Sequence, residues 1–325
     1  MKALLLHNKG QWQDMRVEEF NRPAPEPGEL LVKVYAVGLN PVDYKSATGG
    51  NPAWSYPHIL GLDIAGVVEE VGDQVTQWKQ GDRIVYHGDL TKKGGYAEYA
   101  VTTAHTVSRI PDEVTFEDAA AIPTAGYTAY QALFRKLPID RMDTILIHGG
   151  AGGVGGFGVQ LAKLAGKTVI TTASRNNHEY VRSLGADYVI DYREEDVTAT
   201  VLELTNGRGV DAVVDAVSRQ SATEALGMLT YSGHIVYIAG APDYSMVKPF
   251  TKAISFHEIA LGAVHQHGDH QSQGDLAAMG NAMLALMSQG NLSSMLQEVI
   301  PLKEVPAALK RLSERHVKGK IVVTL

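Results

Sequence analysis

The chain has 325 residues, 45% hydrophobic and 20% charged, which is the composition of an ordinary soluble globular protein with length enough for two domains. Its formal net charge of -7 at pH 7 and the lack of any Lys/Arg-rich run give no electrostatic basis for binding nucleic acid. The absence of cysteine excludes disulfides, thiolate nucleophiles and zinc sites built on cysteine. The apolar stretches are too short for a secretory signal or a membrane span, so we expect a cytoplasmic protein without a membrane partner.

The first 120 residues read as a β domain. Short stretches rich in β-branched and aliphatic residues alternate with turn signals such as Gly72-Asp73 and Gly81-Asp82. The predicted strands are Lys2–His7, Leu30–Val37, Ile64–Val71, Arg83–Tyr86 and Tyr96–Val101. Short strands with closely spaced turns predict a compact, barrel-like domain.

From Thr144 onward, after helical stretches at Glu117–Ala121 and Gly126–Phe134, strands alternate with helices. The predicted strands are Ile145–His148, Thr168–Thr172, Tyr188–Ile190, Ala212–Val217, His234–Ala239 and Ile259–Val264, and the clearest helices between them are Gly155–Ala165 and Glu179–Leu184. This alternation predicts a parallel sheet with helices on both faces, and six strands complete a Rossmann domain.

The alternation ends near Gly268. A helix at Asp275–Gln289, a strand at Gln297–Ile300, a helix at Val305–Arg315 and a last strand at Ile321–Leu325 follow. A β-rich segment after a complete Rossmann unit suggests that the chain returns to finish its first domain. We therefore expect one domain formed by residues 1–122 and 268–325, and a second formed by residues 123–267.

A glycine-rich turn, His148–Gly156, joins the first strand of the predicted parallel sheet to its helix. Gly150, Gly152 and Gly155 stand at G-x-G-x-x-G spacing: the first allows the tight turn, the second lets the backbone approach a pyrophosphate, and the third lets the helix close on the strand. Gly153 and Val154 begin the helix, whose N–H groups and dipole favour phosphate. The sequence predicts dinucleotide binding, the alternative being a tight turn in an unrelated α/β protein.

The nucleotide type depends on the end of the second strand of the parallel sheet. NAD sites place a carboxylate there to bind the ribose 2′-hydroxyl, whereas this chain has Thr171 to Arg175 without an acid. Arg175 can pair with a 2′-phosphate and Ser174 can donate to it, so we expect NADPH. The alternative is that Arg175 is a solvated residue at the start of a helix.

Four motifs carry a resemblance to a known family. They are the segment GLNPVDY at residues 38–44, PHILGLDIAG at 57–66, GGYAEY at 94–99 and LGADYVIDY at 184–192. The chain resembles the medium-chain dehydrogenase/reductase superfamily, and within it the zinc-free quinone oxidoreductases similar to zeta-crystallin. The resemblance implies a Rossmann doubly wound parallel sheet inserted into a GroES-like β-barrel catalytic domain.

The departures from the zinc-dependent members concern the metal ligands. Asn40 and Leu62 stand where those members carry a cysteine and a histidine that bind zinc. Asp63 stands at the next position, where those members carry a glutamate. Neither Asn nor Leu suits zinc, so we expect no metal. The histidines at 265, 267 and 270, with Asp269, offer an alternative metal site, for which a structural or substrate-rim role is the preferred interpretation.

The resemblance also implies roles for individual residues. By that analogy Thr128 lies close to the nicotinamide and is a catalytic residue. Asn40 and Tyr44 are the other expected catalytic residues, because an amide N–H and a phenol can donate to a carbonyl oxygen, and the expected substrate pocket holds Trp54, Tyr86, His87 and His265. The further cofactor-binding residues are Tyr192, Gly240, Ala263, Val264 and Lys320. Each has a plainer alternative: Asn40 fixes a turn, Tyr44 lines a wall, Lys320 is a surface charge. His87 could instead donate a proton.

Without zinc, the natural hydride acceptor is one that spreads negative charge itself. We therefore expect an NADPH-dependent, zinc-independent oxidoreductase acting on a small-molecule quinone or α,β-unsaturated carbonyl. The alternatives are a reductase of simple aldehydes or ketones, as in alcohol dehydrogenases, and a non-catalytic NADPH-binding sensor. The apolar strand at Ile259–Val264 is a predicted sheet edge, and such edges favour a homodimer.

Overall fold

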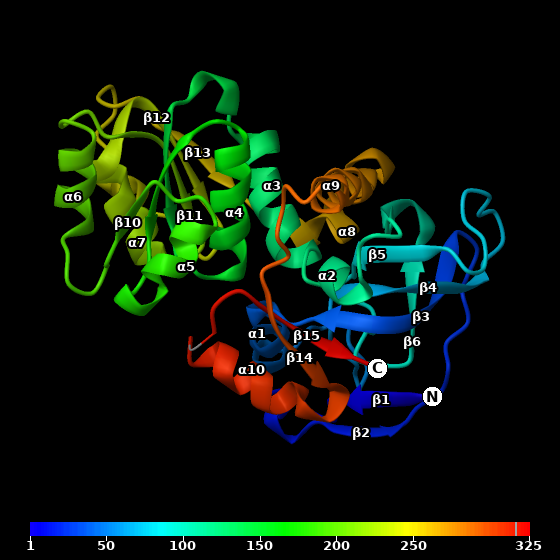
Figure 1. The fold of residues 1–325 in the computed structure, drawn as a ribbon. Helices are drawn as coiled ribbons and strands as arrows, with labels where there is room; N and C mark the ends of the chain where they lie inside the picture. The colour runs from blue at the N-terminus through cyan, green and yellow to red at the C-terminus, as the bar shows by residue number, and fades with distance from the viewer. Residues whose placement is uncertain (316) are drawn as a thin grey trace. The chain divides into compact units, whose positions relative to one another are not determined.

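The computed structural model describes residues 1–315 and 317–325 and divides them into two compact units (Figure 1). The first unit contains residues 1–127 and 261–325, and the second contains residues 128–260. The chain thus leaves the first unit once and returns to it, as the order of predicted elements suggested. The structural divisions fall after Tyr127 and after Ala260, a few residues from the predicted ones.

The second unit is built on a six-stranded parallel sheet. Its strands are β8 (Thr144–His148), β9 (Thr168–Thr172), β10 (Tyr188–Ile190), β11 (Val210–Asp215), β12 (Leu229–Tyr237) and β13 (Ser255–Glu258). The spatial order is β10-β9-β8-β11-β12-β13, so the strand order reverses between β8 and β11. This is the doubly wound Rossmann order, in which ligands bind outside the carboxyl ends of the strands at that reversal.

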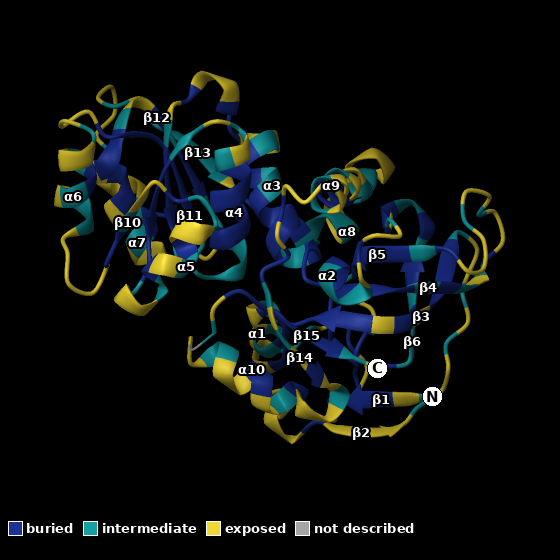
Figure 2. Cartoon of the chain, in the orientation of Figure 1, coloured by how far each residue is buried: buried dark blue, intermediate teal, exposed yellow. Residues whose placement is uncertain are grey.

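Helices cover the sheet of the second unit. They are α3 (Thr128–Gln131), α4 (Gly153–Leu164), α5 (His178–Ser183), α6 (Val197–Leu204) and α7 (Arg219–Ala225). The central strands β8 and β11 are Val- and Ile-rich and almost wholly buried, as both faces of a covered parallel sheet require (Figure 2). Helix α4 packs on β8 and β9, and α7 packs on β11 and β12.

The last strand of this sheet differs from the prediction. We expected it at Ile259–Val264, but the structure places β13 at Ser255–Glu258, paired in parallel with β12. The apolar run instead forms a 3₁₀ turn, Leu261–Ala263, and the start of helix α8 (Val264–His267). The reason is that β13 is an edge strand: its residues are half-buried or exposed, so it lacks the continuous apolar run of a buried strand.

The first unit contains a mixed sheet extended by the end of the chain. Its strands are β3 (Glu29–Gly38), β4 (Asp63–Val71), β5 (Arg83–His87), β6 (Tyr99–Thr103), β7 (Ser108–Arg109), β14 (Leu296–Pro301) and β15 (Lys320–Thr324). Their order is β14-β15-β3-β4-β5-β7, with β6 also paired to β3. Strands β14 and β15 pair in parallel, and the other strand pairs of this sheet are antiparallel. Strands β1 (Lys2–Leu5) and β2 (Arg16–Glu19) form a separate hairpin. The pairing of β15 with β3 joins residues about 280 positions apart, as in Val322 opposite Gly38.

The helices of the first unit are α1 (Pro41–Gly49), α2 (Phe116–Ala120), α8, α9 (His270–Ser288) and α10 (Val305–Ser313). Helix α1 was not predicted, because its sequence has no apolar stripe. It begins instead with a cap in which the Asp43 side chain accepts a hydrogen bond from the N–H of Asn40, and with Pro41 at its first position. None of the helices in the described part of the chain has the length and apolarity needed to cross a membrane.

Candidate active site

The glycine-rich turn after β8 has the three steric roles that its spacing predicts. A Cβ on Gly150 would lie 2.2 Å from Thr171 Oγ1, and a Cβ on Gly155 would lie 2.2 Å from the carbonyl oxygen of Gly149, so both positions exclude any side chain. At Gly152 the nearest heavy atom would be 3.5 Å away. The middle glycine therefore borders open space, which is where a pyrophosphate would approach the backbone.

Helix α4 begins at this open space. Gly152 is its N-cap residue, with extended backbone, and Gly153 and Val154 are its first two residues, both half-buried. Their N–H groups are among those that have no partner within the helix, and the helix dipole places partial positive charge there. The turn and the 12-residue helix together can hold a phosphate group.

Two polar side chains that sequence reasoning missed lie at the ligand-binding edge of the same sheet. His148 ends β8 and Asp215 ends β11, and the two are paired in register at the reversal of strand order. His148 Nε2 and Asp215 Oδ2 are buried and have no hydrogen-bond partner among the described residues. Burial lowers the pKa of His148, which keeps the imidazole neutral. Unsatisfied buried polar atoms at this edge suit the hydroxyl groups of a bound nucleotide.

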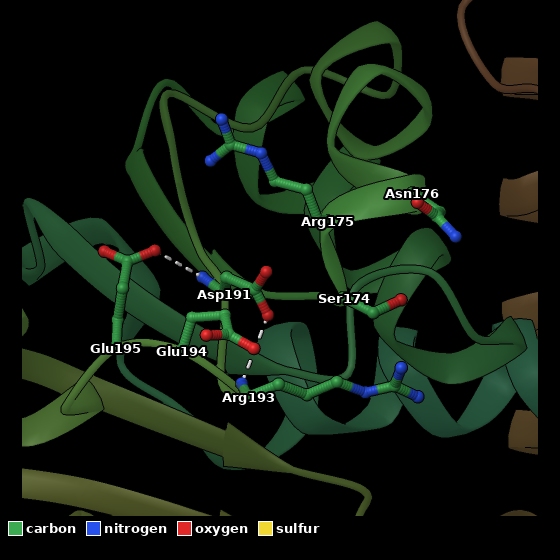
Figure 3. Close-up of a pocket in the computed structure, with 7 residues that line it drawn as sticks. All are labelled: Ser174, Arg175, Asn176, Asp191, Arg193, Glu194 and Glu195. Atoms are coloured by element: carbon green, nitrogen blue, oxygen red, sulfur yellow. Dashed lines mark hydrogen bonds between the residues drawn. The ribbon is translucent and has the colours of Figure 1, made fainter.

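A polar hollow of about 490 Å³ lies beyond the ends of β9 and β10 (Figure 3). It is lined by Ser174, Arg175, Asn176, Asp191, Arg193, Glu194 and Glu195. Figure 3 shows the Arg193 side chain extended toward the side on which Ser174 lies, while Arg175 extends away from Ser174. Arg193 was not predicted as a site residue, although it directly follows Tyr192 in the motif that carried the resemblance.

Two acidic side chains of this hollow are bound to the backbone. The buried Asp191 accepts a hydrogen bond from the N–H of Arg193 at 3.1 Å, and Glu195 accepts one from the N–H of Asp191 at 2.8 Å. The predicted cofactor residue Tyr192 is exposed, with the Arg193 guanidinium 5.7 Å from its ring centroid. These two acids hold the loop, while Arg175, Arg193 and Glu194 supply the other charges that line the hollow.

In the first unit, Asn40 lies in a buried network of charges. Its Nδ2 donates to Asp63 Oδ2 at 2.7 Å, and its Oδ1 accepts from Lys320 Nζ at 2.6 Å. Lys320 Nζ also donates to the carbonyl oxygen of Leu39 and lies 3.6 Å from Asp63 Oδ2. Thr124 donates to the other oxygen of Asp63 through both its N–H and its hydroxyl. Lys320, predicted as a cofactor contact or a surface charge, is therefore buried and holds Asn40 and Asp63.

Asp43 extends this network on α1. Its Oδ2 accepts hydrogen bonds from the N–H of Asn40 at 2.8 Å and from the Tyr96 hydroxyl at 3.0 Å. Burial raises the pKa of Asp43 to about 7, and the neighbouring Asp63 also raises it. Burial lowers the pKa of Lys320, against the opposing effect of Asp63. The hydrogen bonds of Asn40, Asp43, Asp63 and Lys320 thus form one buried polar network.

The other two predicted catalytic residues, Tyr44 and Thr128, belong to different units. Tyr44 is half-buried and packs against Trp12, with ring centroids 5.9 Å apart, on the hydrophobic core of the first unit. Thr128 is buried at the start of α3, the first residue of the second unit. Within the first unit, the network includes Asn40 but not Tyr44.

The predicted pocket residues Trp54 and Tyr86 are buried in the first unit. Trp54 stacks on His58, donates to the carbonyl oxygen of Leu90 at 2.6 Å, and lines a cavity of about 10 Å³, room for a single water rather than a quinone. The Tyr86 hydroxyl has no partner within the described residues. These contacts do not test the prediction that Trp54 and Tyr86 line a substrate pocket.

His87 and His265 face each other. His87 Nδ1 lies 3.4 Å from His265 Nε2, and the ring planes differ by 12°. His270, by contrast, stacks on His105, and Asp269 caps α9 by accepting from the N–H of Ser272. The segment considered as a metal site thus distributes its side chains among different partners. Across residues 1–315 and 317–325, no group of three His, Cys, Asp or Glu side chains is arranged to hold a metal ion.

The remaining predicted cofactor residues lie at element ends. Gly240 follows β12 in the second unit, and a Cβ there would lie 3.1 Å from the N atom of Arg219. Ala263 and Val264, both half-buried, form the junction between the 3₁₀ turn and α8 in the first unit. Their predicted contacts with a nicotinamide stay predictions.

The fold and the glycine-rich turn together define a nucleotide-dependent dehydrogenase or reductase. Residues 26–112 match the family described as "Alcohol dehydrogenase GroES-like domain", and residues 153–279 match "Zinc-binding dehydrogenase". The chain belongs to the medium-chain dehydrogenase/reductase superfamily, whose oxidoreductases use NAD(H) or NADP(H). The predicted combination of a GroES-like domain with a Rossmann sheet is confirmed.

Individual relatives are similar over their full length. The quinone oxidoreductase of Sus scrofa is 30% identical over 308 residues, covering 93% of this chain and 91% of that protein. The structure of a putative zinc-dependent alcohol dehydrogenase from Rhizobium etli CFN 42 is 30% identical, with a TM-score of 0.92, covering 100% of this chain and 98% of that one. The structure of CurK enoyl reductase is 28% identical, with a TM-score of 0.85, covering 99% and 98%.

Proposed function

We propose that this oxidoreductase uses NADPH to reduce a quinone or an α,β-unsaturated carbonyl without zinc. The observation that carries the proposal is the open space at Gly152, flanked by two glycines that tolerate no side chain and facing the N-terminus of α4. The unpartnered atoms of His148 and Asp215 add polar groups that a nucleotide could satisfy at the same edge of the sheet. When bound, the reduced nucleotide supplies the hydride.

The choice of NADPH is supported by the charges of the hollow beside β9 and β10. A 2′-phosphate carries negative charge and three acceptor oxygens, which suit guanidinium groups and a hydroxyl. Arg175, Arg193 and Ser174 supply these groups. The strand end carries no acid of the type that binds a 2′-hydroxyl, and the acids Asp191 and Glu195 are already bound to backbone N–H groups.

The residues at the family's zinc position do not fit a zinc ion. Asn40 has both polar atoms of its side-chain amide bound to Asp63 and Lys320. Leu62, which directly precedes Asp63 in the chain, is a buried aliphatic side chain that offers no ligand atom. Lys320 also brings a positive charge to the position where a cation would lie. No step of the proposed chemistry therefore uses a metal, and the substrate must stabilise its own developing charge.

This requirement favours the acceptor class. A quinone or an enone delocalises the charge left by hydride addition, whereas an isolated ketone gains most from a Lewis acid. A quinone oxidoreductase and an enoyl reductase among the relatives agree with that expectation. The test is NADPH oxidation, followed by absorbance, with a quinone, an enone and a simple ketone. Turnover of the ketone alone would refute the proposed acceptor class, and tight NADPH binding without any turnover would favour a sensor.

The nucleotide preference is tested by reversing the charges of the hollow. Arg175→Glu and Arg193→Glu should each raise the Kd for NADPH by about 10- to 100-fold while leaving NADH binding unchanged or better, because a charge-assisted hydrogen bond is worth about 1.5–3 kcal/mol. Arg182→Glu, on the exposed surface of α5, is the matched control. Equal NADPH affinity in all three variants would contradict the assignment.

The homodimer remains part of the proposal, now carried by β13 as the exposed sheet edge rather than by residues 259–264. An uncovered strand edge is a ready surface for pairing with a second copy. Sedimentation velocity should give a mass near twice 35.0 kDa, and a concentration-independent monomer would contradict it.

A further inference from the structure

The two facing histidines form a path from a buried strand end to a more accessible helix of the first unit. His87 is the last residue of β5 and is 2% exposed, while His265 on α8 is half-buried. Their contact joins His87 Nδ1 to His265 Nε2 at 3.4 Å, with the rings nearly parallel. At Gly262 a Cβ would lie 3.6 Å from His87 Cε1, an ordinary van der Waals contact, so the 3₁₀ turn before α8 borders this ring.

His87, the more buried of the two histidines, lies beside the polar network that contains Asn40. His87 on β5 stands directly opposite Asp63 on β4, and residues directly opposite each other in an antiparallel pair share one face of the sheet. His87 Nε2 makes no hydrogen bond within the described part of the chain and is not one of its fully enclosed polar atoms. This nitrogen is therefore available to a ligand, while Nδ1 is committed to His265.

Both imidazoles are neutral near pH 7. Burial lowers the pKa of His87 to about 4, with Asp63 and Asp89 opposing that shift and His265 adding to it. Burial also lowers the pKa of His265, where Asp89 raises it and Lys92 and His105 lower it. A neutral imidazole has one N–H and one free lone pair, so it can accept a proton at one nitrogen and release another from the second.

We propose that His87 and His265 form a two-histidine proton relay that supplies the proton completing reduction of the acceptor. The inference rests on the proposed function, because it needs an acceptor that takes a hydride from a reduced nicotinamide nucleotide. The hydride's electron pair forms a new C–H bond on the acceptor, or reduces a quinone oxygen, and the nucleotide is oxidised. The acceptor's oxygen or α-carbon takes the proton from His87 Nε2, His87 Nδ1 takes one from His265 Nε2, and His265 recovers its proton from water.

The relay is tested with variants that keep hydrogen bonding but cannot pass a proton. His87→Gln should lower kcat with an enone by about 100-fold, as is usual for loss of a general acid, with the Kd for NADPH unchanged. His265→Gln should lower kcat less, and added imidazole should restore part of it, since a free imidazole can replace the outer donor. His270→Gln, which removes a stacked histidine outside the pair, is the matched control and should keep full activity.

Two readouts separate a relay from a structural role. In D₂O the wild-type protein should place deuterium on one face of the α-carbon, and His87→Gln should place it on both. In the nucleotide-free protein, ¹⁵N NMR should show an exchange-protected imidazole N–H that is lost in both relay variants and retained in His270→Gln. If wild-type protein turns over and His87→Gln keeps its rate and stereochemistry, the relay is wrong while the proposed function stands. If the wild-type protein fails to oxidise NADPH with any of the acceptors tested, the proposed function fails, and the relay with it.

Discussion

Replacing Gly152 by alanine separates nucleotide binding from folding. The backbone at Gly152 has φ -84° and ψ 175°, a region that alanine adopts without strain, and the new Cβ would meet only the Gly149 carbonyl oxygen at 3.5 Å. Loss of a glycine N-cap to alanine then limits the destabilisation to less than about 1 kcal/mol. The methyl group would, however, project into the space proposed for the pyrophosphate.

The expected loss is one of affinity. Holding the pyrophosphate away from the turn weakens several backbone hydrogen bonds at once, so Gly152→Ala should raise the Kd for NADPH by about 10- to 100-fold, or about 1.4–2.7 kcal/mol. Gly155→Ala is the contrasting variant, because its Cβ would lie 2.2 Å from a backbone oxygen. It should lower the free energy of unfolding by about 1–3 kcal/mol, as overpacking does.

Thermal unfolding and a fluorescence titration with NADPH measure both effects. Gly152→Ala should keep the wild-type Tm within a few degrees and lose affinity, while Gly155→Ala should lose Tm. If Gly152→Ala bound NADPH as tightly as wild-type protein, the pyrophosphate would not lie against this turn. If it lost as much Tm as Gly155→Ala, the space beside Gly152 would not be open.

The remaining predictions concern the buried network of the first unit. The pKa of Asp43 is raised by burial to about 7, so the stability contributed by its bound proton is complete below about pH 4 and is lost as the pH rises through 7. Asp43→Asn cannot lose this proton, so its free energy of unfolding relative to wild type should increase by about 2–3 kcal/mol between pH 5 and pH 8. Asp73→Asn, at an exposed position, is the control. A difference in stability that did not change with pH would contradict a buried proton on Asp43. Lys320→Met should destabilise the protein by about 3 kcal/mol in urea unfolding, because it leaves Asp63 buried without its cation. Adding Asp63→Asn should recover part of that loss, and full additivity of the two variants would show that the pair does not interact.

The features predicted correctly from the sequence are those determined by short segments. The strand β8, the glycine turn and the helix α4 follow one another within some twenty residues, and each glycine's role comes from its immediate neighbours. The strands β9 and β10 were placed at their observed bounds, because both are short runs of β-branched and aromatic residues. The sequence pattern was enough to place an element where the residues of that element alone determine its structure.

The wrong predictions concern features whose structure depends on residues far apart in the sequence. Strand β13 was misplaced because an edge strand need not be apolar, and the run at 259–264 leads instead into a 3₁₀ turn and helix α8, with Ile259 and Leu261 buried. Helix α1 has no apolar stripe, yet the spacing of Asn40 and Asp43 was a capping signal that could have identified it. The buried role of Lys320 depends on contact with a residue 280 positions earlier, which no local pattern contains.

The pairing of β15 with β3 has a consequence for the order in which the molecule forms. The second unit is one continuous segment, so it can fold as soon as residues 128–260 have left the ribosome. The first unit must wait, because Ala36 to Gly38, which pair with β4 on one side, gain their partners on the other side only when residues 322–324 have been made. Until then a strand edge is uncovered and the carboxylate of Asp63 lacks its ammonium partner. A half-made chain therefore carries one finished unit and one that is still vulnerable to aggregation, and synthesis itself sets the interval during which a chaperone would be needed.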